Sequence, residues 1–458
     1  MKVIDNRKDS IMRIQIPENA NKIIQILMSH GYEAYVVGGC VRDSILNKKP
    51  MDWDITTSAS PIEVKQLFGR TIDTGIQHGT VTILMGKEAY EVTTYRVDGE
   101  YEDHRRPKEV VFTKSLEEDL KRRDFTINAM AYNDEEGLQD LFGGIRDLEE
   151  GVIRCVGVPE ERFDEDALRI LRAIRFSAQL NFLIDEKTKQ AMKSRANHLK
   201  EISAERIQVE LTKLLVSDHP EKLFEAQELG ITNVILQEFD HMMETEQNNP
   251  HHCYTVGVHT IYGVKCIEAD PILRWTMLLH DIAKPMKKTT DSNGVDHFYG
   301  HDVEGESVAK QILRRMKLDN HTIQTVCKLV RWHDYHFEAP VTTKKIRYAM
   351  NKIGVDIFPL LLKVQKADAL AQSEYRREEK LANIEEAKRQ YEEIIQSGQC
   401  VTIKQLAVNG KNLMEVGIEP GVKMGEILQK LLELVLEYPE QNQKDILLDF
   451  VKTQYQNL

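Results

Sequence analysis

The fold of the chain can be inferred from two neighbouring segments, Gly38-Gly39-Cys40-Val41-Arg42-Asp43 and Met51-Asp52-Trp53-Asp54-Ile55. The run Ala34-Tyr-Val-Val37 before the glycines has the β propensity of a strand. Paired glycines let backbone N–H groups approach a phosphate, and the helix that we expect to begin at Gly39 adds a favourable dipole. Because turns also use Gly-Gly constantly, Gly38 and Gly39 alone are weak evidence for a nucleotide site.

The two aspartates give this stretch its chemistry. In a strand, Asp52 and Asp54 would point to the same face. Adjacent carboxylates repel one another unless cations neutralise them, and hard oxygen ligands suit Mg²⁺. Glu91 is the candidate third carboxylate, although it could equally pair with an arginine. The pattern predicts two-metal phosphoryl transfer, with solvated turn residues as the alternative.

Two further motifs carry groups that suit a nucleotide. Arg123 could bind phosphate oxygens bidentately. Asp124 and Asn128 are four residues apart, so on a helix they would share a face and could contact ribose hydroxyls. On a second helix, Asp166 and Arg169 would offer an acceptor beside donors, as reading a base edge requires. For that pair the alternative is an intrahelical ion pair.

Size and composition indicate an ordinary globular protein. At ~150 residues per domain, 458 residues suggest about three units. We expect a cytoplasmic protein outside the membrane, because the chain has no long apolar run and its six cysteines form no CxxC pair. The net charge of −12 argues against a nucleic-acid partner, but residues 162–214 hold 11 Lys and Arg against 8 Asp and Glu. RNA should therefore bind there and near Arg105, Arg106 and Lys121–Arg123.

The expected fold class is α+β, with a mixed-sheet head followed by helices. Strand-like runs occur at Thr80–Met85, Tyr90–Tyr95 and Val110–Thr113, and a helix is expected at Ala20–Ser29. From Phe163 onward helical spacing dominates. We divide the chain into a head (14–155), a helical neck and RNA-binding body (156–246), a histidine-rich helical unit (254–370) and a helical tail (371–458).

In their order and spacing these motifs resemble the class II tRNA nucleotidyltransferases, the CCA-adding enzymes of the polymerase-beta-like superfamily. The likeness rests on Gly38-Gly39…Asp52-x-Asp54, Arg122-Arg123-Asp-Phe-x-x-Asn128 and Glu165-Asp166-x-x-Arg169. It implies that Asp52 and Asp54 bind metal. It also implies nucleotide-binding roles for Gly39, Arg42, Arg123, Arg172 and Arg175, with Asp166 and Arg169 as the amino-acid template for CTP and ATP. Residues 141–148 would be the hinge between head and neck, and residues 201–210 a structural neck motif.

The histidine-rich unit holds a second constellation, His259…His280-Asp281…Asp368, with His301 and His333 as possible accessories. Mixed imidazole and carboxylate ligands suit Mn²⁺, Ni²⁺, Co²⁺, Fe or Zn²⁺. A lone histidine is more often a satisfied core residue. This order resembles the HD superfamily of metal-dependent phosphohydrolases over about residues 255–370, which implies hydrolysis of phosphate esters.

The sequence thus predicts an ATP- and CTP-dependent enzyme that adds CCA to tRNA, with Mg²⁺ in its head and an accessory HD domain. The loop Asp98–Pro107 resembles that of enzymes able to add the terminal adenosine. Addition of A alone and poly(A) polymerase activity remain alternatives. From other classes, we consider an HD phosphohydrolase whose head only binds nucleotide, and a non-catalytic RNA-binding module. The oligomeric state stays open.

Overall fold

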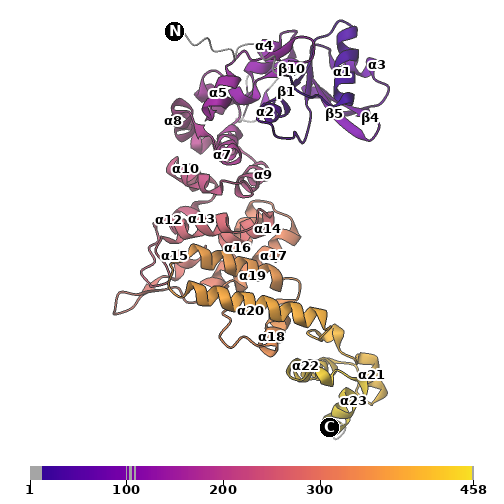
Figure 1. Cartoon of the computed structure of the whole chain (residues 1–458), viewed down its shortest axis with the longest axis vertical. Coiled ribbons are helices and arrows are strands. Elements are labelled where there is room, and N and C mark those ends of the chain that lie inside the picture. The colour runs from indigo at the N-terminus through magenta and orange to yellow at the C-terminus, as the bar shows by residue number, and fades with distance from the viewer. Residues whose placement is uncertain (1–12, 99–100, 103–105, 108–109, 456–458) are drawn as a thin grey trace, which may run out of the picture. The chain divides into compact units, whose positions relative to one another are not determined.

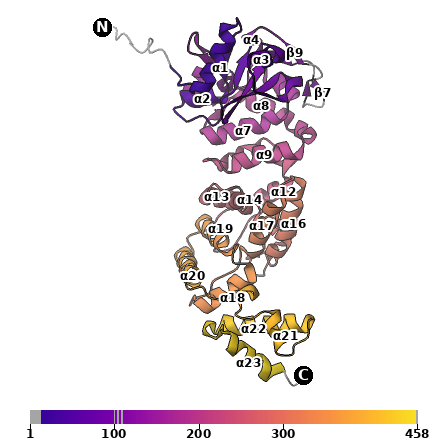
Figure 2. The same ribbon diagram turned by 90° about the vertical axis from the view of Figure 1, so that its right-hand side faces the viewer.

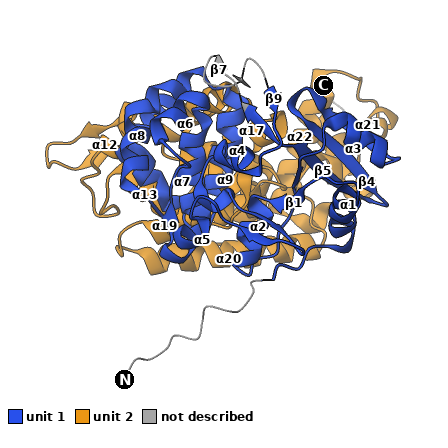
Figure 3. Cartoon of the chain, turned by 90° about the horizontal axis from the view of Figure 1, so that it is seen from above, with its two compact units in different colours: residues 1–237 blue, residues 238–458 orange. Residues whose placement is uncertain are grey.

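The computed structural model describes residues 13–98, 101–102, 106–107 and 110–455. The chain divides into two compact units, residues 1–237 and 238–458 (Figure 3). The first joins a mixed sheet to helices, whereas the described part of the second is helical apart from one short ribbon (Figure 1). The α+β class is therefore confirmed, while the finer division into four parts stays a prediction. No helix among the described residues is long and apolar enough to cross a membrane.

A seven-stranded sheet, in the order β11-β10-β1-β2-β5-β4-β3, forms the centre of the head. Only β2 and β5 run parallel, with Ile55 opposite Val92. This register places Asp54, just before β2, beside Glu91 in β5. The strands are β1 (Ala34–Val37), β2 (Ile55–Thr57), β3 (Thr71–Gly75), β4 (Thr80–Met85), β5 (Glu88–Thr94), β10 (Ala131–Asn133) and β11 (Gly137–Gln139).

Helices in the head begin where the sequence supplies caps. Ser60 and Glu63 form a reciprocal capping box at the start of α3, and the Ser115 side chain caps α4. The apolar side chains Ile23, Ile24 and Leu27 of α1 are fully buried, which is the amphipathic spacing expected for this helix. The head elements are α1 (Glu18–Ser29), α2 (Gly39–Ile45), α3 (Pro61–Leu67), the 3₁₀ turn η1 (Ile76–His78), α4 (Leu116–Lys121), the 3₁₀ turn η2 (Thr126–Asn128) and α5 (Gly144–Glu150).

The loop between β5 and α4 is described only in part. Strand β6 (Arg96–Asp98) pairs with β9 (Val110–Phe112), and β7 (Tyr101–Glu102) pairs with β8 (Arg106–Pro107). Residues 99–100, 103–105 and 108–109 lie outside the described residues. The RNA contact expected at Arg105 therefore falls outside them as well.

Helices also complete the first unit. Helices α7 and α9 pack together and bury one face each, including Ile174 and Leu211. Helix α7 ends at Leu180 and is followed by Asn181, whose positive φ of 57° is the left-handed conformation common after helices. The elements are β12 (Val152–Ile153), α6 (Pro159–Glu165), α7 (Leu168–Leu180), β13 (Leu183–Ile184), α8 (Glu186–Arg195), the 3₁₀ turn η3 (Ala196–Glu201), α9 (Ala204–Leu215), the 3₁₀ turn η4 (Pro220–Lys222), α10 (Leu223–Glu228) and α11 (Thr232–Ile235).

In the second unit, α13, α14, α17 and α19 pack around a core with Trp275 and Phe358 fully buried (Figure 2). The dipeptide Asp270-Pro271 is typical of a helix start, an N-cap followed by proline, and in the structure Asp270 caps α14 and Pro271 is its first residue. The helices are α12 (Gln237–Glu244), α13 (Val256–Cys266), α14 (Pro271–Leu279), α15 (Lys284–Lys287), α16 (His301–Arg315), α17 (Asn320–Trp332), α18 (Thr343–Ile353), α19 (Phe358–Ala371), α20 (Arg377–Gln396), α21 (Gly410–Glu415), α22 (Val422–Glu437) and α23 (Lys444–Tyr455), with the 3₁₀ turns η5 (Ile403–Gln405) and η6 (Pro439–Gln441). The ribbon joins β14 (Thr289–Thr290) and β15 (Asp296–His297).

Candidate active site and metal centre

The head aspartates lie in an extended segment before β2, so the prediction that they belong to a strand is wrong. The backbone N–H of Val37 nevertheless bonds to the carbonyl of Asp54 at 3.0 Å, which anchors this segment to the end of β1. Asp52, Asp54 and Glu91 are exposed. Desolvation of the carboxyl and the nearby charges of Glu91 and Asp52 raise the pKa of Asp54, against the opposing effect of Arg123. The site thus concentrates negative charge.

Gly38 brings the backbone close to Arg123. Its φ of +83° lies in the left-handed region, and a Cβ at this position would be 3.1 Å from Nη1 of Arg123. Arg123 Nη2 lies 3.4 Å from the buried carboxylate of Asp119, which also accepts a hydrogen bond from Thr56. Among the described residues, the buried Nε of Arg123 has no hydrogen-bond partner, so the protein does not fully pair this guanidinium.

The motif after Arg123 forms a 3₁₀ turn, so the prediction that Asp124 and Asn128 share a helix face is wrong. Asn128 instead donates to Asp124 at 3.1 Å and accepts from Arg42 Nη1 at 2.7 Å. Arg172 Nη2 lies 2.6 Å from the second oxygen of Asp124. Burial raises the pKa of Asp124, but Arg172 and Asn128 outweigh it and lower this pKa to about 2. These groups form a buried network within the first unit.

Asp166 and Arg169 do not share one helix, because α6 ends before Asp166 and α7 begins at Leu168. Leu168 N–H donates to Asp166 Oδ1 at 3.1 Å, as at a helix N-terminus. Arg206, in α9, lies 2.7 Å from Asp166 Oδ2. The guanidinium of Arg169 donates to Glu165 at 2.5 Å and to the Arg122 carbonyl at 2.8 Å. The two proposed base-reading side chains thus have separate protein partners.

Phe176 in α7 gathers three guanidinium groups. Arg175 lies 3.9 Å from the ring centroid, Arg42 5.0 Å and Arg172 5.3 Å. Arg175 also pairs with the buried Glu210 at 2.5 Å. Cation–π contacts and the carboxylate fix the arginines in place. The structure therefore brings the predicted residues Arg42, Arg172 and Arg175 together at one surface of α7.

The second constellation comes from five helices, α13, α14, α16, α17 and α19, or from the residues directly after them. His259 Nε2 lies 2.9 Å from Asp368 Oδ1 and 3.3 Å from His280 Nε2. Asp281 Oδ2 is 3.2 Å from His280 Nε2. Asp281 Oδ1 lies 3.5 Å from Nε2 of both His301 and His333, so the two accessory candidates belong to the same cluster. Among the described residues, His259, His280 and Asp368 form one group of three candidate metal ligands. Asp281, His301 and His333 form a second such group.

The backbone orients every imidazole in this cluster. Nδ1 of His259, His280, His301 and His333 lies 3.2, 2.8, 2.8 and 2.7 Å, respectively, from a carbonyl oxygen. A carbonyl only accepts, so each Nδ1 carries a proton and each Nε2 faces the centre, as metal-binding histidines require. Although burial lowers the pKa of His280, Asp281 and Asp368 raise it to about 10.

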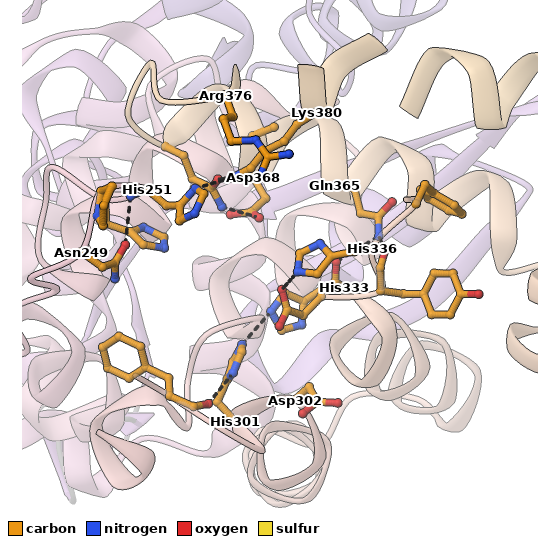
Figure 4. A pocket seen from close by; sticks show the side chains of 18 of the residues that line it. Asn249, His251, His301, Asp302, His333, His336, Gln365, Asp368, Arg376 and Lys380 are labelled. Carbon is orange, nitrogen blue, oxygen red and sulfur yellow. Dashed lines mark hydrogen bonds and ion pairs between the residues drawn. The ribbon is translucent and has the colours of Figure 1, made fainter. Parts of the chain in front are cut away.

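A cavity of about 990 Å³ opens beside this cluster (Figure 4). Asp368, His301 and His333 line it together with Lys380 and Arg376 of the α19–α20 region. Lys380 Nζ contacts the neutral groups Gln372 Oε1 and His251 Nδ1. A ligand that reaches the cluster therefore also meets positive charge.

Sequence reasoning missed three residues of these sites. Asp119, which holds Arg122 and Arg123, is four residues before Arg123, a spacing that signals a helical ion pair. Arg206 was assigned only a structural neck role, and no local pattern connects it with Asp166. Lys380 belongs to a highly charged helix, and such a charge pattern is typical of a solvent-exposed surface rather than of a binding site.

Comparisons with known proteins cover the same regions. Residues 34–154 match the family model of the poly(A) polymerase head domain, 181–243 a probable RNA- and SrmB-binding site of polymerase A, and 302–451 a putative tRNA nucleotidyltransferase domain 2. The chain is 37% identical over 439 residues to the CCA-adding enzyme of Lactiplantibacillus plantarum, covering 94% of this chain and 95% of that one. The Enterococcus faecalis CCA-adding enzyme is 35% identical, with 95% and 96% covered. The crystal structure of the Bacillus stearothermophilus CCA-adding enzyme with CTP is 29% identical and covers 97% of this chain and 100% of its own, with a TM-score of 0.70.

Proposed function

The chain belongs to the CCA-adding enzymes, a family of tRNA nucleotidyltransferases, and we propose that Asp52, Asp54 and Glu91 form the metal site at which it extends tRNA. It adds the 3′-terminal CCA of tRNA from CTP and ATP without a nucleic-acid template. In each addition the 3′-hydroxyl oxygen of the tRNA forms a bond to the α-phosphorus. The bond between the α-phosphorus and the oxygen that links it to the β-phosphate breaks, and pyrophosphate leaves.

The observation that carries this proposal is the placement of Asp54 beside Glu91 across the parallel strands β2 and β5. Nucleotidyltransferases of this kind use divalent metals, and the three carboxylates fit Mg²⁺ because they supply the hard oxygen ligands that this ion prefers. Burial of the carboxyl and the charges of Glu91 and Asp52 raise the pKa of Asp54, so a cation there would relieve the repulsion. Bound there, Mg²⁺ would activate the hydroxyl and stabilise charge on the phosphates. Exposure of all three carboxylates leaves room for the substrates.

The phosphate and base contacts would come from the neighbouring residues. We assign the triphosphate to Gly38, Gly39, Arg42 and Arg123. Arg123 Nη1 would lie 3.1 Å from a Cβ at Gly38, and the Nε of Arg123 has no hydrogen-bond partner within the described part of the chain. Asp124 pairs with Arg172, and Asn128 accepts a hydrogen bond from Arg42. We therefore assign these two side chains the positioning of the arginines in addition to the contact with the ribose. Asp166 and Arg169 would read the base edge, with Arg172 and Arg175 beside them.

Incorporation of labelled CTP and ATP into tRNA lacking CCA tests the metal site. Asp52→Ala and Asp54→Ala should each reduce incorporation by at least about 100-fold, since each removes charge that the transition state requires. Asp73→Ala is the matched control and should retain activity. It removes an exposed aspartate in β3 of the same sheet, which pairs with Lys65 of α3. Near-normal incorporation by Asp54→Ala would remove the proposal.

The second unit supports a further activity, metal-dependent hydrolysis of phosphate esters. We propose that His259, His280, Asp281 and Asp368 hold a divalent ion such as Mn²⁺, Ni²⁺, Co²⁺, Fe or Zn²⁺. Support comes from the shared inward orientation of Nε2 in His259 and His280, which mixed N and O ligation needs. Ring opening of 2′,3′-cyclic phosphate ends and release of phosphate from 3′-phosphorylated RNA ends by wild type, and the loss of both reactions in His280→Gln, test this assignment. Equal release by both proteins would exclude it.

A further inference from the structure

Asp119, near the end of α4, is a fully buried carboxylate with donors on both of its oxygens. Oδ2 accepts a hydrogen bond from the Thr56 hydroxyl at 3.1 Å and lies 3.4 Å from Nη2 of Arg123. Oδ1 accepts from Nε of Arg122 at 3.0 Å. Although burial raises the pKa of the Asp119 carboxyl, Arg122 and Arg123 outweigh this effect and lower it. Asp119 is therefore a buried charge, and such a charge is stable only while its partners stay in place.

The contact with Thr56 connects Asp119 to the strands beside the proposed metal site. Thr56 is fully buried in β2 and comes two residues after Asp54. Strand β2 pairs in parallel with β5, which contains Glu91. Because Thr56 belongs to this sheet, its hydroxyl is a fixed point relative to both carboxylates. Asp119 is thus held at a defined distance from the proposed metal ligands.

Arg122 extends the same connection toward the side chain proposed to read the base. Its guanidinium binds Asp119, while its backbone carbonyl accepts a hydrogen bond from Arg169 Nη2 at 2.8 Å. The neighbouring carbonyl of Lys121 accepts from Arg162 Nη1 at 3.1 Å. The last carbonyls of a helix have no partner within that helix, so these two arginines complete the end of α4. Helix α4 therefore contacts both the sheet and the arginines that follow it in sequence.

We infer that Asp119 is a positioning residue for nucleotide addition, which fixes Arg123 relative to the metal-binding carboxylates. Being fully buried, it acts through Arg123 rather than on a substrate. Its charge is the property that matters, because charge-assisted hydrogen bonds are roughly twice as strong as neutral ones. This inference rests on the proposed triphosphate role of Arg123 and adds the residue that holds this arginine in place.

Asp119→Asn tests the inference, since it preserves the size of the side chain and removes its charge. Pyrophosphate is the probe, because it carries phosphates without a base or a ribose. Its inhibition constant against CTP incorporation and the KM values for CTP and ATP should each rise roughly 10-fold, while the KM for tRNA stays unchanged. Misfolding alone would reduce the number of active molecules and hence kcat, but it would leave these constants at their wild-type values.

Asp185→Asn is the matched control, because Asp185 also accepts hydrogen bonds from an arginine and a threonine of the first unit, Arg154 and Thr188. It should keep the wild-type constants. Thr56→Val removes only the hydroxyl donor and retains the shape of the side chain. It should raise the pyrophosphate inhibition constant by about 2-fold to 5-fold, the effect of one lost hydrogen bond. This variant also tests the inference if Asp119→Asn does not fold.

Arg123→Ala, alone and combined with Asp119→Asn, shows whether the effect passes through Arg123. Arg123→Ala should raise the pyrophosphate inhibition constant, and adding Asp119→Asn should raise it by less than about 2-fold further. A further rise of roughly 10-fold in the double variant would overturn the inference. Wild-type constants in folded Asp119→Asn, or in Thr56→Val if Asp119→Asn does not fold, would also overturn it. A wild-type pyrophosphate constant in Arg123→Ala would instead reject the triphosphate role of Arg123 itself, and with it the inference.

Discussion

Arg206 Nη2, in α9, lies 2.7 Å from Oδ2 of Asp166, which directly follows α6 and is 40 residues away in sequence. This ion pair fixes one oxygen of the carboxylate proposed to read the incoming base, while Leu168 N–H fixes the other. The orientation of Asp166 therefore depends on a helix outside the motif that contains it.

Removing this contact should impair base selection. We predict that Arg206→Ala lowers CTP incorporation by roughly 10-fold to 100-fold, the equivalent of a lost charge-assisted hydrogen bond. Because a freely rotating carboxylate also discriminates poorly, misincorporated UTP should increase. Arg206→Lys should partly restore both. Competition assays with mixed nucleotides measure the ratio.

Arg195→Ala is the control, since it breaks a comparable 2.8 Å pair with Asp164 on the same unit. Identical nucleotide selectivity in Arg206→Ala and Arg195→Ala would show that Arg206 does not act through Asp166.

Gly38→Ala should damage the nucleotide site more than its backbone strain explains. A non-glycine residue at φ +83° and ψ −127° costs about 1–3 kcal/mol, and the new Cβ would press on Arg123 at 3.1 Å. Gly31→Ala has nearly the same φ, +86°, with open space around it. Both variants should lose similar stability, but only Gly38→Ala should show a raised KM for CTP and ATP. Equal KM values in the two variants would refute the contact with Arg123.

The buried pair of Asp124 and Arg172 should make the first unit sensitive to acid. The folded pKa of Asp124, about 2, lies below its ordinary value of 3.8. Its contribution, roughly 2 kcal/mol, is therefore full above pH 5, and roughly half of it is lost by pH 3. Asp124→Asn should lack this dependence, so its deficit in the free energy of unfolding should shrink as the pH falls.

Urea unfolding followed by hydrogen-exchange mass spectrometry measures this deficit, because it separates peptides of the first unit from those of the second. A deficit that stays constant between pH 5 and pH 3 would mean that Asp124 is not the group responsible.

The chemistry of the two units should be separable. Asp54→Ala should abolish nucleotide addition and leave phosphate-ester hydrolysis unchanged. His280→Gln should abolish hydrolysis and leave nucleotide addition unchanged, since the residues assigned to the two sites are different. Assaying both activities on each variant measures the separation. Loss of hydrolysis in Asp54→Ala would place that activity in the head.

The sequence was most informative where local patterns suffice. The alternating residues of Thr80–Met85 and the cap at Asp270 predict β4 and the start of α14 correctly. The β10–β11 hairpin was missed because its two strands have three residues each, too few for a periodic signal. A local pattern also extended helical spacing through Asp124 and Asp166, where the chain turns instead.

Site geometry depended on contacts that sequence spacing cannot show. The motif order placed the metal-binding candidates on the correct segments, but the partner of Asp166 lies 40 residues away. The distances of 3.5 Å from Asp281 Oδ1 to His301 and His333 likewise depend on where α14, α16 and α17 pack. Motifs therefore identified the groups, and tertiary packing determined their partners.

The most direct test of the central claim follows single nucleotide additions by purified full-length protein. A tRNA that ends before CCA would be supplied with CTP, ATP, both, or neither, and the products sequenced at their 3′ ends. We predict two cytidines with CTP alone and a complete CCA with both nucleotides, each lost in Asp54→Ala. Extension only of a tRNA already ending in CC, or a long adenosine tract, would contradict CCA addition by this enzyme.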